Sequence, residues 1–151
     1  MLTERRLSRE LALQIMYQRE HGREDGEQAV RAFASHFRAP AKLMGYARRL
    51  VLGVAEEQES LDQALQKASP HWKLERMSHI DRNILRLAAY EIIHGQAPVK
   101  VAINEAVELA KSFGGESSPS FVNGVLDALA RQMGAVEERS GMAGEQGFEP
   151  R

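Results

Sequence analysis

The sequence predicts an all-α protein of two small helical bundles, about seven helices in all, which a long central helix and a short connector join. Apolar residues recur at steps of three and four through most of the chain, and β-branched runs are short. Capping residues, glycines and prolines stand where these periodic segments end. The 151 residues, 43% of them hydrophobic, can bury one sizeable core or two small ones. We expect an N-terminal bundle at 1–70, a C-terminal bundle at 71–134 and a disordered tail at 135–151, within one compact unit overall.

The first expected helix, residues 3–21, carries arginines in its first turns. The apolar stripe expected to face the core is Leu7, Leu11, Ile15 and Gln18. If this stripe faces the core, the opposite, outer face of the helix holds Arg6, Arg9, Leu13 and Tyr17. Guanidinium groups bind phosphates and a tyrosine ring stacks on an unpaired base, so this face suits RNA. The alternative is a solvated face with Tyr17 half in the core.

The next two helices have clear boundaries. Asp25 and Gln28 form a capping-box pattern that opens a second helix, which Pro40 closes. The third helix is expected over 41–68, with a gap in its apolar pattern at Gln58. It ends at Ser69, because the residue before a proline is pushed out of the helical region.

A connector follows, and then a helix that buries a charge. We expect Trp72 to fill the joint between the halves, with ligand stacking as the alternative. Ser78 and Asp81 form a capping-box pattern for a helix that reaches about His94. Glu91 falls inside its apolar stripe and therefore needs a partner such as an arginine. We interpret Glu91 as structural, and the alternative is a functional site.

The last two helices, from Val99 to Phe113 and from Ser118 onward, are separated by two glycines. Ser118 is expected to cap the second of them, with Pro119 as its first helical residue. The positive end of this helix could bind a phosphate beside Ser120 and Phe121, although a plain capped helix end is the more common outcome. After Gly134 the periodicity stops, which predicts the disordered tail.

Composition argues against several classes of protein. The chain has no cysteine, and its five histidines show no metal-ligand spacing, so no metal site is expected. A P-loop, a dinucleotide fingerprint and a nucleophile elbow are also missing from the sequence, so neither enzymatic activity nor a cofactor is expected. No segment has the apolar length of a membrane span, and a cytoplasmic, soluble protein without membrane contact is the default.

Charge is distributed unevenly along the chain. Residues 1–50 hold ten Lys or Arg against six Asp or Glu, whereas residues 51–151 hold ten against fifteen. The front half is therefore positive by four and the remainder negative by five. This division permits a polyanion on one side and a basic partner on the other.

Three blocks of the sequence carry a resemblance to a known family. They are RRLSRELALQIMYQRE near the N-terminus, SHIDRNILRLAAYEII in the middle, and VKVAINEAVELAKSFGGESSPSFVNGVLD toward the C-terminus. Together they resemble the NusB family of bacterial transcription antitermination factors, from Arg5 to Ala130. The resemblance implies an all-helical protein that binds a single-stranded boxA-type RNA element in nascent ribosomal RNA transcripts. It also implies NusE, a ribosomal small-subunit protein, as partner, and the antitermination complex of RNA polymerase as the assembly that the pair joins.

The resemblance also implies site residues. Its RNA-binding positions correspond to Arg5, Arg6, Arg9, Tyr17, Ser117, Ser120 and Phe121. Its partner-binding face corresponds to Glu75, Asp81 and Arg82. The family's opening run is often more densely basic, whereas Leu7 and Ser8 interrupt it here.

Two alternatives stand beside this interpretation. The chain could be a helical interaction module that binds no RNA, or a homodimer that hides its basic face. It could also be an accessory domain of an RNA methyltransferase, although 151 residues leave no room for a cofactor-binding domain.

Overall fold

The all-α prediction is confirmed. The computed structural model describes residues 2–22, 25–37 and 39–144, with side chains described for 4–20, 25–35 and 39–134. The described residues form six α-helices and one short 3₁₀ turn. They are α1 (Leu2–Gly22), α2 (Gly26–Phe37), α3 (Ala41–Ala68), η1 (Leu74–Arg76), α4 (His79–Ile93), α5 (Val99–Phe113) and α6 (Ser118–Gly144).

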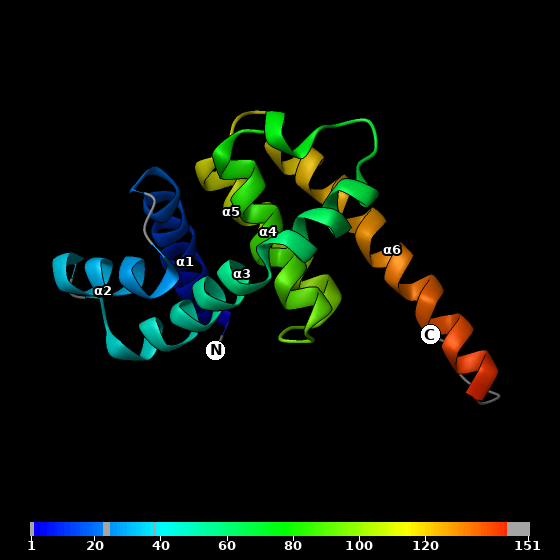
Figure 1. Cartoon of the computed structure of the whole chain (residues 1–151), viewed down its shortest axis with the longest axis horizontal. Coiled ribbons are helices and arrows are strands. Elements are labelled where there is room, and N and C mark those ends of the chain that lie inside the picture. The colour runs from blue at the N-terminus through cyan, green and yellow to red at the C-terminus, as the bar shows by residue number, and fades with distance from the viewer. Residues whose placement is uncertain (1, 23–24, 38, 145–151) are drawn as a thin grey trace.

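Helix α3 connects the two halves of the chain. Figure 1 shows α1 and α2 on the left, α4 and α5 in the middle and α6 on the right, with α3 running from the lower left across the molecule toward α6. The helix packs most extensively on α1 and α4, and also contacts α6. Buried apolar side chains from both halves form one continuous cluster, with Ile15 and Leu50 from the first half and Ile84 and Leu126 from the second. The core is therefore shared between the segments 1–70 and 71–134.

The bounds of α3 agree with the predicted 41–68, but the helix is kinked. Glu57 has φ −111° and ψ 20°, directly before the residue where the apolar pattern has its gap. The Glu57 side chain meets His94 at 2.6 Å from Oε1 to Nε2. One turn earlier, the ring of Tyr90 lies where a Cβ on Gly53 would be. Glycine at this position lets α4 pack directly against the backbone of α3.

The connector between α3 and α4 is held by one amide side chain. Gln66 Nε2 donates to the carbonyl oxygens of Ser69 (3.1 Å) and Trp72 (2.7 Å), and Gln66 Oε1 accepts from the amide of Leu74 (2.9 Å). These bonds satisfy backbone groups that have no helical partner. Trp72 itself is 60% exposed, so the prediction that it fills the joint is wrong. Leu74 is the buried apolar residue of the connector.

Helix α6 is longer than the sequence pattern predicts. Figure 1 shows its C-terminal part extending away from the other helices. The backbone is helical to Gly144, within the segment 135–151 that was predicted to be disordered. Residues 145–151 of that segment lie outside the described residues. None of the described helices has the length and apolar character needed to cross a membrane.

Candidate nucleic-acid interface

The outer face of α1 differs from the predicted one. Ser8, Arg9, Leu13 and Ile15 are buried, whereas Leu7 is 42% exposed and Gln18 is exposed. The helix is thus rotated so that Arg9 and Leu13 point inward. Apolar residues occur on more than one side of this helix, and the buried side includes the partner of an ion pair, Arg9.

Arg9 is 3% exposed and lies against the fully buried Glu91 of α4. Its Nε lies 3.0 Å from each carboxylate oxygen. The hydroxyl of Tyr46, on α3, donates to the same carboxylate. The prediction that Glu91 needs a structural partner is confirmed, and the expectation that Arg9 lies on the surface is wrong. Burial and the neighbouring carboxylate of Glu91 raise the pKa of Tyr46, so its hydroxyl stays protonated and keeps donating.

Arg6 is partly exposed and bound to a second carboxylate. Its Nε and Nη2 donate to the two oxygens of Glu105 on α5, at 2.9 Å and 2.8 Å. This two-pronged geometry is the one that guanidinium groups also use for phosphates. The hydrogen bond from Arg6 lowers the pKa of Glu105, and its effect outweighs the opposing effect of burial. A phosphate that approaches Arg6 must therefore share it with Glu105 or displace it.

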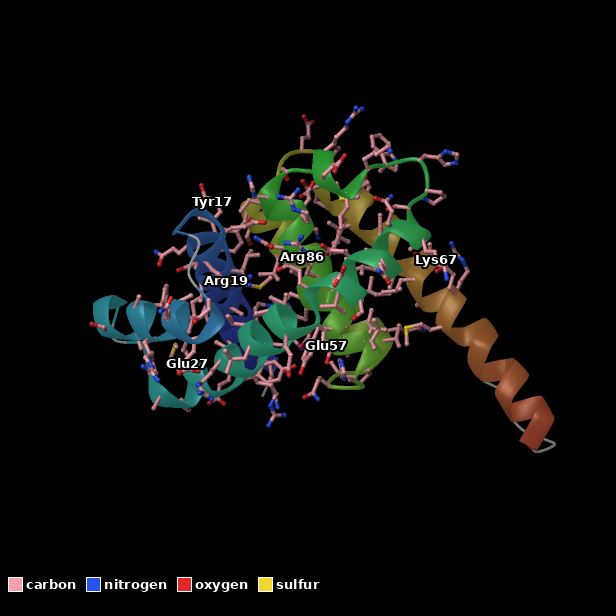
Figure 2. The ribbon with its side chains drawn as sticks, in the orientation of Figure 1. Tyr17, Arg19, Glu27, Glu57, Lys67 and Arg86 are labelled. Carbon is pink, nitrogen blue, oxygen red and sulfur yellow. The ribbon has the colours of Figure 1, made fainter. Side chains whose placement is uncertain are left out.

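Arg5 is the most exposed of the three predicted RNA-binding arginines. Its guanidinium carbon lies 3.7 Å from the centre of the Tyr46 ring, in a cation–π contact. Tyr17 lies near the C-terminal end of the same helix and is 43% exposed. Figure 2 shows it at the edge of the molecule, whereas Arg86 lies among the side chains of the centre. Of the four residues predicted to bind RNA from α1, Arg5, Arg6 and Tyr17 therefore reach solvent and Arg9 does not.

The beginning of α6 carries the other predicted RNA residues. The hydroxyl of Ser118 accepts from the amide of Gly115 at 3.0 Å, and Ser118 is already helical, so the prediction that it caps the helix is wrong. Ser117 precedes the helix, and its carbonyl accepts from the amide of Phe121 and from the hydroxyl of Ser120. Phe121 packs against the core and meets the exposed Trp72 edge to face, with ring centres 5.7 Å apart.

Trp72 and Phe121 therefore form one aromatic surface, which we call the α6 aromatic pair. The sequence pattern did not join them, because 48 residues of chain lie between the two positions. The two rings of this pair contact each other, whereas Arg5 and Arg6 contact Tyr46 and Glu105. The structure thus contains two separate aromatic and polar regions that could contact a nucleic acid.

The three predicted partner-binding residues differ in accessibility. Glu75 is exposed on η1, and Asp81 is partly buried in the first turn of α4. The Asp81 amide donates to the hydroxyl of Ser78 at 3.1 Å, which confirms that Ser78 caps α4. Arg82 is 9% exposed and donates to the carbonyls of Leu74, Glu75 and Met77. Arg82 therefore fixes η1 against α4 and offers little surface of its own.

Below this face lies a charged network that the sequence did not reveal. Arg86 binds both oxygens of Asp62, at 2.8 Å and 2.9 Å, and Glu20 accepts from Arg82 and Arg86. Burial raises the pKa of Glu20, but the hydrogen bond from His79 and the charge of Arg82 outweigh it, so the pKa lies below its ordinary value. A pocket of about 630 Å³ opens over these groups. Among the described residues, no group of histidine, aspartate and glutamate side chains has a metal-binding arrangement.

Comparison with known proteins identifies the relatives of this chain. The sequence profile of the NusB family matches residues 6–131. The transcription antitermination protein NusB of Anaeromyxobacter dehalogenans (strain 2CP-1) is 44% identical over 131 residues, which are 86% of this chain and 92% of that protein. The protein of the same name from Bdellovibrio bacteriovorus is 45% identical over 132 residues, 86% of this chain and 97% of the relative.

Solved structures agree with these relatives. T. maritima NusB superposes with a TM-score of 0.77 at 37% identity and covers 85% of this chain and 91% of its own. The structure of the antitermination factors NusB and NusE in complex with double-stranded RNA contains a chain that superposes with a TM-score of 0.77. That chain is 25% identical, and the match covers 87% of this chain and 99% of that one.

Proposed function

The chain belongs to the NusB family, and from that premise we propose that it is an RNA-binding transcription antitermination factor. It would bind a boxA-type single-stranded element in nascent ribosomal RNA transcripts together with the ribosomal protein NusE. The pair would then join elongating RNA polymerase in the cytoplasm. The observation that carries the proposal is the family match over residues 6–131, which includes all the expected site residues except Arg5.

The proposed RNA surface has two parts. Arg5 and Arg6 on α1 would bind phosphates, and Tyr17 on the same helix would stack on a base. The second part of the RNA surface is the α6 aromatic pair, which would stack on bases beside Ser117 and Ser120. Arg9 supports this surface from below, because its guanidinium is buried against Glu91.

The proposed partner face lies on η1 and α4. Glu75 and Asp81 present carboxylates there, and Arg82 orders the backbone beneath them. Residues 51–151 are negative by five, which suits a basic ribosomal protein. This face adjoins the second part of the RNA surface, because Trp72 stands three residues before Glu75, so RNA and NusE would lie next to each other at η1.

RNA binding is tested by fluorescence anisotropy of a labelled boxA RNA with this protein alone, with NusE, and across a salt series. We expect tighter binding with NusE and a salt slope that reports several released counterions. Arg5→Ala with Arg6→Ala should lower both the affinity and the slope, whereas Arg31→Ala, an exposed arginine of α2, should change neither. A scrambled RNA and a duplex RNA serve as competitors, since the solved relative contains double-stranded RNA.

Partner binding is tested by calorimetric titration with NusE. We expect Glu75→Arg to weaken binding, while Glu56→Arg, an exposed acidic residue of α3, should leave it unchanged. Absence of RNA binding in both arms, with folded protein, would contradict the proposal and favour a helical interaction module. A doubling of the molecular mass by light scattering that RNA does not reverse would favour a homodimer that hides the basic face.

A further inference from the structure

A second cationic region lies between α1 and α3 and shares only Arg5 with the predicted RNA surface. A pocket of about 350 Å³ opens there, lined by Glu4, Arg5, Ser8, Lys42, Gly45, Tyr46 and Arg49. Three of these side chains are cations and one is a carboxylate. Lys42 and Arg49 come from α3, which no sequence pattern connected with nucleic acid.

The cations of this pocket are only partly neutralised. Lys42 binds Glu4 at 3.0 Å between Nζ and Oε2. Arg5 rests on the Tyr46 ring, and Arg49 donates to the neutral amide oxygen of Gln96 at 3.1 Å. Among the described residues, neither Arg5 nor Arg49 has a carboxylate oxygen within 4.0 Å of its guanidinium nitrogens. The pocket therefore carries a net charge of about +2, which attracts anions.

The hydroxyl groups in the pocket are already used. Ser8 donates its hydroxyl hydrogen to the carbonyl of Leu43 at 2.9 Å, and the hydroxyl of Tyr46 donates to Glu91. Apart from Glu4, which is paired with Lys42, the polar side chains that remain for a ligand are cationic donors, which suit phosphate oxygens better than base edges. A ligand would thus be bound by charge and without base specificity.

We propose that this pocket binds a backbone phosphate of the RNA beyond the segment held by Arg5, Arg6 and Tyr17. Arg5 connects the RNA surface of α1 with the pocket, because it is exposed on α1 and also lines the pocket. The RNA would continue from α1 across the pocket onto α3, where Lys42 and Arg49 contact the phosphate. This inference rests on the proposed RNA-binding function and adds α3 to the RNA path.

The chain offers a matched pair of variants as a test. Arg49→Gln removes a pocket cation, and Arg48→Gln removes its sequence neighbour, which pairs with Glu27 and does not line the pocket. Both residues are exposed, so both variants should keep the helical circular dichroism and melting temperature of the parent protein. Affinity is measured by anisotropy in the presence of NusE, with a boxA RNA and with the same RNA extended stepwise at either end.

We expect Arg49→Gln to weaken binding of the extended RNA by roughly threefold to tenfold and to reduce the salt slope by about 0.7, the value for one phosphate contact on a single strand. Binding of the shortest RNA should be unaffected. Glu4→Gln should act in the opposite direction and strengthen binding of the extended RNA, because it removes the carboxylate of the pocket and releases Lys42.

The outcomes separate this inference from the proposed function. If the parent protein binds boxA RNA but Arg49→Gln and Arg48→Gln behave alike at every RNA length, the pocket takes no part and the inference is overturned. If Glu4→Gln weakens the binding of extended RNA, the expected sign is wrong and the inference is also overturned. If the parent protein binds no RNA with or without NusE, the proposed function itself fails.

Discussion

Substituting Arg9 should damage the fold far more than its place in an arginine-rich segment suggests. Arg9→Met removes the Nε that lies 3.0 Å from both oxygens of Glu91 and leaves that carboxylate fully buried. Removal of one partner from a buried ion pair costs about 3–5 kcal/mol, because the remaining charge is uncompensated. Domains are stable by only about 5–15 kcal/mol, so this loss is a large part of the total. For a chain of this size it lowers the melting temperature by roughly 6–20 °C.

The assay is urea unfolding followed by circular dichroism at neutral pH. Arg9→Met should lower the midpoint without changing the slope of the transition. The informative control is the combination of Arg9→Met, Glu91→Leu and Tyr46→Phe, which replaces Arg9, the carboxylate that it binds and the hydroxyl that donates to that carboxylate by apolar groups. Since buried ion pairs are often replaced by apolar residues at little cost, this combination should recover most of the lost stability.

Two results would refute this reasoning. A free energy of unfolding for Arg9→Met within about 1 kcal/mol of the parent protein would mean that Glu91 is not held as a buried charge by Arg9. A combined variant no more stable than Arg9→Met would mean that packing, rather than the stranded charge, carries the loss. The first result would return Arg9 to the candidates for direct RNA contact, whereas the second would leave it a buried, structural residue.

Three further predictions concern packing, charge and the connector. Gly53→Ala should lower the free energy of unfolding by about 1–3 kcal/mol in urea titration, because the added methyl group overlaps the Tyr90 ring. The pKa of Glu105 is lower in the folded protein than its ordinary value of 4.5. Its contribution to the free energy of unfolding is therefore complete above about pH 4.5 and is lost as the pH falls through the folded pKa. Glu105→Gln should flatten the pH dependence of stability below about pH 4.5. Gln66→Ala leaves the Leu74 amide without its acceptor and should cost about 1–3 kcal/mol in the same titration, with faster hydrogen exchange in the connector.

Helix positions could be read from the sequence because they depend on local patterns. The bounds of α3 follow from apolar spacing and from Ser69 before Pro70, and the Asp25–Gln28 capping box forms as expected, with Asp25 Oδ1 accepting from the Gln28 amide at 2.8 Å. The kink at Glu57 was not predicted, although it lies next to the gap in the apolar pattern at Gln58. Helix bounds and capping boxes are decided within a few residues of chain, which is the range that periodicity and capping rules cover.

The rotation of α1 could not be read from its own residues. Leu7 and Leu11 on one side compete with Leu13 and Met16 on the other, and the choice depends on what α3 and α4 supply. The sequence did contain one signal for this rotation. Glu91 in an apolar stripe required a buried cation as partner, and Arg9 is such a cation. The exposure of Trp72 had no such signal, because the connector is fixed by hydrogen bonds from Gln66 and not by a periodic pattern.

The three arginines of the opening segment have three different environments, and this difference bears on how RNA would bind. Arg9 is committed to Glu91, Arg6 is shared with Glu105, and Arg5 faces only an aromatic ring and a cationic pocket within the described part of the chain. The carboxylates of Glu91 and Glu105 thus neutralise much of the positive charge that these arginines give to the N-terminal segment. We therefore expect weak RNA binding by the isolated protein, since of these three arginines only Arg5 offers its charge without competition from a carboxylate. A partner that adds its own contacts, or a longer RNA that reaches Lys42 and Arg49, would supply what α1 alone lacks.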